Sequence, residues 1–424
     1  MKWIERLITL FSLVLLVSAT SFAGGFLFRE LRIAPTQEVL TLKSQLGQWR
    51  RTGLWGDEDE FPRTNLAPVA TPVRVVNPEA FHPGYRVVTG ADPVFGYSVR
   101  LIDETGSIAH VWPLKEEITP RTHGLVALPD GSLVLVTSGG PTGDSGTIAR
   151  VDACGDRIWQ NHGQYHHQVH LSDDGSLWTW FSPAHHNGHF QSMVQVDPTT
   201  GAVLRDLSLN DVASASRRNA LILRIPDGFD FRHRASLPSD IAADIWHPND
   251  VEPLPAEMAD AFENFEAGDL LISLRNIDLV AVIDPETLDI KWWQSGPWSR
   301  QHDPDFMADG TIEVYDNATS FGRSSIVTVD PVTGETWRRH PSDSHHWYSK
   351  SQGMHARLPN GNSLITVPWE GRVIELDADG ELVFEHRFMV SDAQTGRSSN
   401  ALWLPLGYFE TFPSCGDQLH ASRR

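Results

Sequence analysis

A repeat of about 46 residues runs through the chain and constrains its fold more than any other feature. Each copy holds an apolar strand, an aspartate, a short turn and a second strand, as in IARVDACGDRIW and IVTVDPVTGETWRR. Aspartate accepts local hydrogen bonds in turns and glycine adopts positive φ there, so each copy predicts a β-hairpin. The aspartates that mark the six copies are Asp103, Asp152, Asp197, Asp284, Asp330 and Asp377.

A second strand–turn–strand motif accompanies these hairpins, as in HGLVALPDGSLVLV, HQVHLSDDGSLWTW, HDPDFMADGTIEVY and GMHARLPNGNSLIT. Two hairpins make a four-stranded blade, so six copies predict an all-β, six-bladed β-propeller over residues 84–412. The tail SSNALWLPLGYF is similar to the start of the second motif. We therefore expect the carboxy-terminal strand to complete the first blade and close the ring, an exchange that the alternative, a β-solenoid, does not need.

The spacing between Asp197 and Asp284 is 87 residues, which indicates an insertion at residues 208–268. Its segment SRRNALILRIPDGFDFRHRAS is basic. A basic flap over the mouth of the propeller would recruit anions. An ordinary solvated loop is the alternative.

The first 32 residues are expected to form a membrane anchor. No residue from Leu7 to Phe28 is charged, and a bilayer core needs about 20 apolar residues in a helix. Lys2 and Arg6 precede this stretch, so the amino terminus should stay in the cytoplasm. A cleaved signal peptide is the alternative, because Ser21-Phe22-Ala23 fits a cleavage site.

With either an anchor or a signal peptide, the remaining chain would be exported, and we expect it to lie in the periplasm. It would be attached to a bacterial inner membrane by a single span, or secreted into the periplasm after cleavage. Residues 33–83 are predicted to be a juxtamembrane helix, at residues 36–51, followed by a proline-rich linker. Export permits a disulfide between the two cysteines, Cys154 and Cys415. The sequence leaves open whether they pair, because it does not show how close they lie.

The formal net charge of −20 bears on the partners of the protein. Nucleic acid requires a basic face, so it is excluded as a ligand. An anionic substrate would need a local positive pocket in an otherwise negative molecule.

Histidines recur where the innermost strand of each predicted blade begins. His123, His167 and His302 each stand seven residues before the aspartate of a DG turn. His247 is expected at the same position of its strand, and His355 lies two residues further along its own. Innermost strands surround the propeller axis, so these imidazoles should converge on one channel. A structural hydrogen-bonding role is the alternative for any one of them.

Two kinds of site fit such a ring of imidazoles. Zinc, copper or iron would bind to it. The accompanying residues, however, are Arg275, Arg323 and Asn249. A guanidinium near a dication is unfavourable, whereas its fork matches a sulfate or phosphate. We therefore expect an oxyanion pocket that needs no metal.

Residues 160–370 resemble the bacterial arylsulfate sulfotransferase family. The resemblance is carried by WHPND around His247, LLISLR at Arg275, VIDP and IKWW after it, QHD at His302, and VYDN followed by Arg323. It implies an exported six-bladed propeller that moves a sulfuryl group from an aryl sulfate donor to a phenolic acceptor. Members of the family need neither the nucleotide sulfate donor nor a metal, so no cofactor is expected.

Positional matching to the family implies roles for individual residues. His302 matches the nucleophile that becomes sulfated on nitrogen, and His247 and Arg275 match the groups that bind the sulfuryl oxygens. His167 matches the histidine that assists proton transfer, although HHQ stands here where the family has HHD. Further substrate contacts are expected from Asn249, Arg323, His355, His123 and Ser351, of which Ser351 replaces a threonine.

Three hypotheses for the function follow. The leading one is an aryl sulfotransferase with a sulfohistidine intermediate. The second is a non-catalytic, membrane-anchored envelope propeller that binds an anionic ligand or a partner protein. The third is a metal-dependent lyase or hydrolase that uses the same histidines.

Overall fold

The computed structural model describes Leu66 and residues 69–415, apart from residues 93–95, 115–120, 139–145, 183–190, 217–218, 220–221, 224–245, 320, 341–344 and 392–393. The predicted anchor, the juxtamembrane helix and the arginines of the basic insertion lie outside the described residues. Within the described residues, no helix is both long and apolar enough to span a membrane.

The described strands form five antiparallel sheets. Three sheets have four strands each: β12 (Pro248–Pro253), β13 (Leu270–Leu274), β14 (Leu279–Ile283) and β15 (Ile290–Ser295); β16 (His302–Phe306), β17 (Ile312–Asp316), β18 (Ser325–Val329) and β19 (Thr336–Arg338); and β25 (Ser398–Leu404), β2 (Tyr85–Asp92), β3 (Gly96–Ile102) and β4 (Ile108–Pro113).

The other two sheets are larger. One has seven strands: β5 (Arg121–Ala127), β6 (Leu133–Ser138), β7 (Gly146–Val151), β8 (Arg157–Leu171), β9 (Leu177–Ser182), β10 (Ser192–Val196) and β11 (Val203–Ser208). The other has six: β20 (Met354–Arg357), β21 (Ser363–Val367), β22 (Arg372–Leu376), β23 (Leu382–Ser391), β24 (Gln394–Gly396) and β1 (Val73–Val75). The strand β1 comes from the segment expected to be a linker.

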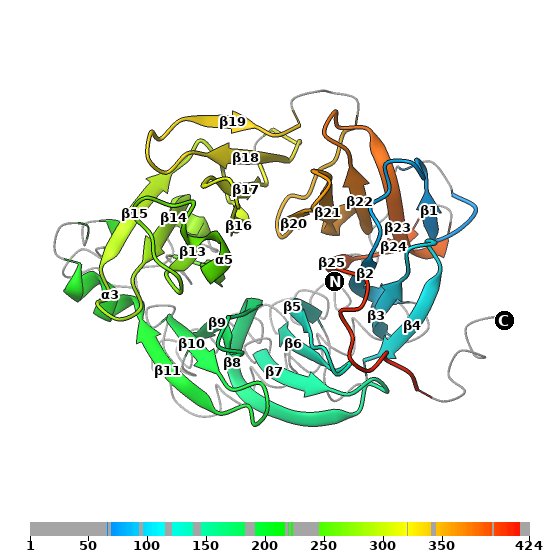
Figure 1. The fold of residues 1–424 in the computed structure, drawn as a ribbon, viewed down its shortest axis with the longest axis horizontal. Helices are drawn as coiled ribbons and strands as arrows, with labels where there is room; N and C mark the ends of the chain where they lie inside the picture. The colour runs from blue at the N-terminus through cyan, green and yellow to red at the C-terminus, as the bar shows by residue number, and fades with distance from the viewer. Residues whose placement is uncertain are drawn as a thin grey trace, which may run out of the picture. The chain divides into compact units, whose positions relative to one another are not determined.

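Six inner strands form a closed ring around one axis (Figure 1). Strand β5 contacts β8, which contacts β12, and the series continues through β16, β20 and β25 back to β5. The prediction of an all-β, propeller-like arrangement is confirmed. The expected set of six separate four-stranded blades is not seen, because β8 is 15 residues long and pairs with β7 through its first half and with β9 through its second.

The repeated aspartates build the outer turns as predicted. In all six copies the side chain of the aspartate accepts a hydrogen bond from the backbone N–H two residues later, as from Thr105 to Asp103 at 2.9 Å and from Glu286 to Asp284 at 2.8 Å. The fourth copy has no glycine in this turn, and Leu288 takes the positive φ of 60° instead.

The predicted insertion is shorter than residues 208–268 at its carboxy-terminal side. Residues 248–253 form the inner strand β12, which pairs with β13. The described part of the insertion holds α3 (Leu209–Ala215), and the short helix α5 (Ala256–Ala259) lies between β12 and β13.

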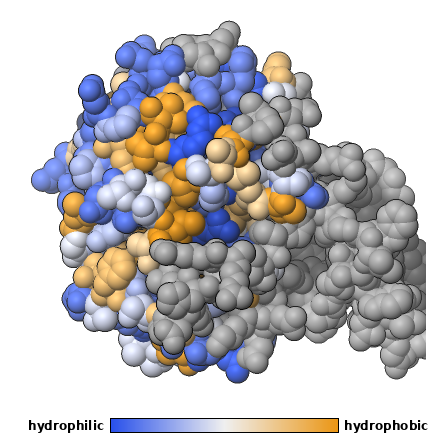
Figure 2. Space-filling view, turned by 90° about the vertical axis from the view of Figure 1, so that its right-hand side faces the viewer, coloured by the Kyte–Doolittle hydropathy of each residue, from blue (hydrophilic) through white to orange (hydrophobic). Residues whose placement is uncertain are grey.

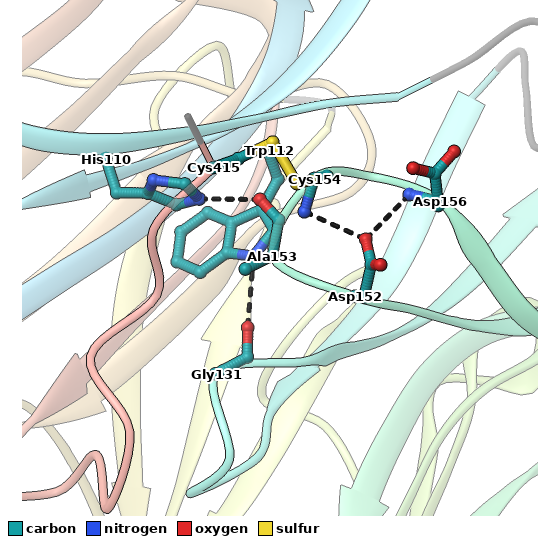
Figure 3. The surroundings of a disulfide bond; sticks show 8 residues. All are labelled: His110, Trp112, Gly131, Asp152, Ala153, Cys154, Asp156 and Cys415. Atoms are coloured by element: carbon teal, nitrogen blue, oxygen red, sulfur yellow. Dashed lines mark hydrogen bonds between the residues drawn. A yellow bond between two sulfur atoms is a disulfide. The ribbon is translucent and has the colours of Figure 1, made fainter. Parts of the chain in front are cut away.

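The carboxy-terminal strand closes the ring as predicted. Strand β25 pairs antiparallel with β2, with Leu404 opposite Tyr85. The segment after it is fixed by a disulfide between Cys154 and Cys415, whose Cα atoms lie 5.1 Å apart (Figure 3). The possible disulfide is therefore formed, and it joins the β7–β8 turn to the tail.

Hydrophobic residues of neighbouring sheets pack face to face. Leu271 and Val282 from β13 and β14, for example, share one cluster with Val314 and Val327 from β17 and β18. Full burial of such a side chain stabilises the fold by about 1.5–3 kcal/mol. On the side that carries β1 and β23, hydrophobic and hydrophilic residues are interspersed over the described surface (Figure 2).

Candidate active site

One register position of the six inner strands lines a small cavity on the axis. Five residues within inner strands hold this position, namely His123, His167, Asn249, His302 and Ser399, and Gly353 holds it directly before β20. Gln168 and Gln352 complete the lining. The cavity volume is about 10 Å³, room for about one water molecule, so a larger ligand requires side chains to move.

Irregular backbone turns these side chains toward the axis. The ladders of the inner strands shift register at His123, between His166 and Val169, at Asn249 and at Asp303. A bulge changes the direction of a side chain and is common beside active sites. Four non-glycine residues also have positive φ here: His167 at 65°, His247 at 48°, Asp303 at 48° and Gln352 at 60°. Backbone strain of this kind clusters at functional sites.

The imidazole of His302 is held in one tautomer. Its Nδ1 lies 2.6 Å from Oδ1 of Asn317, and Nδ2 of Asn317 donates to the carbonyls of Ser349 and Gln352. The amide oxygen must therefore face His302, whose Nδ1 carries the proton. Its Nε2 accepts from the backbone N–H of Gln352 at 3.2 Å. Burial and the positive charge of Arg275 hold the pKa of His302 well below its usual range.

A chain of hydrogen bonds also fixes His167. Nε2 of His166 lies 2.9 Å from Oε1 of Gln191, an acceptor, so this nitrogen donates. Nδ1 of His166 is then the acceptor for Nδ1–H of His167, at 2.7 Å. Nε2 of His167 keeps its lone pair, because the other nitrogen holds the proton. Burial and then the neighbouring imidazoles of His247, His166, His123 and His302 lower the pKa of His167.

Arg275 and His247 are joined through the backbone. Arg275 begins the 3-10 helix η3 (Arg275–Ile277), and its N–H donates to the carbonyl of His247 at 3.1 Å. The ring of His247 lies 4.9 Å from that of His167. Asn249 is 1% exposed and donates through Nδ2 to the carbonyl of Gln301, while its Oδ1 has no hydrogen bond among the described residues.

Three other predicted residues, His123, Ser351 and Arg323, differ in whether they line this cavity and in what they contact. Nδ1 of His123 lies 3.2 Å from Nε2 of Gln352, which donates to it. Ser351 precedes Gln352, and its hydroxyl accepts from the indole of Trp369 at 3.0 Å. Arg323 lies between β17 and β18, is partly exposed, and does not line the cavity.

The structure does not bring His355 to this cavity. It stands two residues past the shared register position and lines a second cavity farther along the axis. That cavity is acidic, with Glu252, Asp303 and Asp305 in its wall. Burial lowers the pKa of His355, but the carboxylates of Asp303 and Glu313 outweigh it and raise the pKa to about 9. The described lining of the cavity around His302 contains no carboxylate, which makes it the better candidate for an oxyanion site.

Sequence reasoning missed the residues that orient the histidines. Asn317 follows β17, and Gln352 precedes β20. Gln191 reaches His166 from the start of β10. The repeat register could have identified Gly353 and Ser399, because they correspond in position to His302 in their own repeats. The hydrogen-bond partners of the imidazoles come from other turns, and the sequence has no signal for them.

The ring of inner strands and the imidazoles in its axial cavity define an all-β protein of the β-propeller class. The arylsulfotransferase (ASST) family model matches residues 124–389 of the chain. The chain therefore belongs to the arylsulfotransferase family, which implies sulfotransferase-like activity on small aryl substrates. No curated protein matches the sequence.

Solved structures give weaker similarities. A protein of unknown function from Bacteroides caccae is 12% identical, with a TM-score of 0.49, over 76% of this chain and 99% of its own. Virginiamycin B lyase from Staphylococcus aureus is 12% identical, with a TM-score of 0.34, over 62% of this chain and 69% of its own. Neither similarity bears on the function.

Proposed function

We propose that the protein transfers a sulfuryl group from an aryl sulfate ester to a phenol through a sulfohistidine at His302. The observation that supports this most is the hydrogen bond from Nδ1–H of His302 to Asn317. It leaves the lone pair on Nε2, which accepts from the backbone N–H of Gln352 at 3.2 Å and would exchange this bond for the sulfur of the donor. A neutral imidazole held in this tautomer is a competent nucleophile.

The sulfuryl oxygens would be bound by Arg275 and His247. Sulfuryl transfer, like phosphoryl transfer, spreads negative charge over the equatorial oxygens of a loose transition state. Fixed cations and N–H donors stabilise such charge most in a site that excludes water. The backbone bond between Arg275 and His247 keeps the two groups together.

The transfer proceeds in two balanced steps. In the first, the bond between sulfur and the donor oxygen breaks, a bond between sulfur and Nε2 of His302 forms, and the phenoxide leaves. In the second, the acceptor oxygen bonds to sulfur and the nitrogen–sulfur bond breaks. The acceptor proton passes to Nε2 of His167, which returns it to solvent, where the released phenoxide is protonated.

Asn249 would orient the acceptor. Asn249 lines the cavity, and its buried Oδ1 has no hydrogen bond among the described residues. A buried acceptor without a partner is costly. The hydroxyl of a phenol supplies the missing donor while the acceptor binds, before its proton passes to His167, whereas a sulfate ester has none to offer.

The ring of six inner strands supports a six-bladed propeller, in which β8 is both the last strand of one blade and the first strand of the next.

An exported location is proposed on the basis of the Cys154–Cys415 disulfide, since such bonds persist in oxidising compartments. Residues 1–32 would attach the protein to the inner membrane.

Steady-state kinetics with 4-nitrophenyl sulfate and a phenol test the function. We expect parallel lines for varied donor and acceptor, because an intermediate on His302 separates the two steps. His302→Ala should abolish turnover and Arg275→Ala should lower it about 10²–10³-fold. Arg205→Ala is the control, because its exposed ion pair with Glu286 lies at an outer strand. Ligand-dependent stabilisation without turnover over a broad donor panel would instead favour the non-catalytic anion-binding propeller.

A further inference from the structure

The acidic cavity beyond the His302 layer contains a group of side chains that the sulfuryl transfer does not use. The cavity has a volume of about 820 Å³ and is lined by residues of all six inner strands, β5, β8, β12, β16, β20 and β25. Asp303, Asp305 and His355 each offer one ligand atom there, and these atoms lie within 4.8 Å of one another.

Several polar atoms of this group are buried without a hydrogen bond. Nδ1 of His355 lies 3.0 Å from Oδ2 of Asp303, but its Nε2 has no hydrogen bond among the described residues. The same holds for Oδ1 of Asp303 and Oε2 of Glu313. His355 and Asp303 are 4% and 1% exposed. Such atoms are costly to bury unless something binds them.

The distances match ligands that share an ion. Nε2 of His355 lies 3.6 Å from Oδ2 of Asp305 and 3.6 Å from Oε2 of Glu313. These separations are too long for hydrogen bonds. Two ligand atoms at about 2.1 Å from a tetrahedral ion are about 3.4 Å apart. The nitrogen and the carboxylate oxygens are thus spaced for a common ion with little movement.

The charges also favour a cation. Glu313 has Arg357 as a partner. Neither Asp303 nor Asp305, by contrast, forms an ion pair with a lysine or arginine of the described chain. The cationic groups near them are the imidazole of His355 and, for Asp303, that of His170. The side chain of Asp305 is 15% exposed, which gives the cluster a route to solvent through the cavity.

We propose that Asp303, Asp305 and His355 bind one divalent cation of the first transition row, with Glu313 as a further ligand. Carboxylates with one imidazole suit Mn²⁺ or Zn²⁺ better than Mg²⁺ or Ca²⁺, which take oxygen ligands. Asp303 directly follows His302, at the bulge of β16. The ion would fix this bulge and so position the nucleophile, without contacting the sulfuryl group.

Metal binding to the purified full-length protein tests the proposal. After chelation and dialysis, MnCl₂ or ZnCl₂ should bind at one equivalent in calorimetry and raise the melting temperature by several degrees. Asp305→Asn and His355→Gln should each lose the binding and the shift. Asp174→Asn is the matched control, because Asp174 is an aspartate of a DG turn that does not line this cavity, and it should bind as the wild type does.

A spectroscopic measurement covers the case in which the variants fail to fold. Spin-echo spectra of the Mn²⁺-loaded wild type should show coupling to one imidazole nitrogen. Absence of stoichiometric binding to the wild type would overturn the proposal and leave a proton on His355 as the balancing charge. Binding retained in Asp305→Asn and His355→Gln, or bound Mn²⁺ without nitrogen coupling, would also overturn it. None of these results depends on sulfotransferase activity.

Discussion

Nδ1 of His302 lies 2.6 Å from Oδ1 of Asn317, and this bond leaves the lone pair of the imidazole on Nε2, the nitrogen proposed to attack the substrate. Asn317 itself is 0% exposed and is anchored by two backbone carbonyls through its Nδ2. The proposed nucleophile is therefore positioned by Asn317, which follows β17 in the same sheet as β16.

Replacement of Asn317 should reduce catalysis without unfolding the protein. Asn317→Ala removes the acceptor that holds the tautomer of His302, and loss of a buried hydrogen-bond partner costs about 1–3 kcal/mol. We expect kcat/KM to fall about 10- to 100-fold. Asn360→Ala, which removes an exposed asparagine bonded to the carbonyl of Ala80, is the control. An unchanged kcat/KM in Asn317→Ala would show that the bond does not position the nucleophile.

Gly353 should not tolerate a side chain. Its φ is 130°, and a Cβ there would lie 2.2 Å from Cζ of Tyr315. We expect Gly353→Ala to destabilise the protein by about 2–4 kcal/mol, from backbone strain plus overpacking. Gly361→Ala is matched to it, since φ is 89° and no atom lies within 4 Å of the added Cβ. It should cost about 1 kcal/mol. Urea denaturation measures the free energy of unfolding, and equal losses in the two variants would contradict overpacking of the added Cβ against Tyr315.

The disulfide should stabilise the closure of the ring. It encloses a loop with a sequence separation of 261 residues, and cross-links of long loops restrict the unfolded chain. Cys154→Ser with Cys415→Ser should lower the free energy of unfolding by about 2–4 kcal/mol. Urea denaturation under oxidising conditions measures the loss. Under reducing conditions the wild type should match the variant, and a wild type that keeps its full advantage there would argue against the bond.

Stability should fall as the pH drops below about 6.5, in part because of His386. Its side chain is 0% exposed, and burial and then Arg100 hold its pKa well below the usual range. In this window the unfolded chain binds a proton that the folded chain does not, so the free energy of unfolding rises with pH. His386→Gln should reduce that slope by up to about 1.4 kcal/mol per pH unit. Urea denaturation at pH 7, 6 and 5 tests this, and an unchanged slope would be inconsistent with a neutral buried His386.

The sequence predicted the fold because its turns are local. The backbone bonds to Asp103 and Asp284 span two residues each, and the closing pair of β25 with β2 followed from a repeated motif. The sequence did not predict that β8 joins two neighbouring blades in one sheet. The first half of β8 pairs with β7 and the second half with β9, and no turn motif marks the boundary between the two halves.

Part of the site was predictable because the register of the histidines, like the turns, is set by local sequence. The interval of seven residues to the DG turn placed His123, His167 and His302 in one layer. The same interval excludes His355, which lies two residues beyond it and belongs to the acidic cavity. The partner Asn317 lies in a different turn, and only the folded structure shows which turns meet.

Intact-mass spectrometry of the protein after exposure to 4-nitrophenyl sulfate tests the central claim most directly. A sulfohistidine at His302 predicts one added SO₃ group, absent in His302→Ala and lost from the wild type when a phenol is added. Turnover with no added mass in the wild type, or an adduct that persists in His302→Ala, would contradict the account.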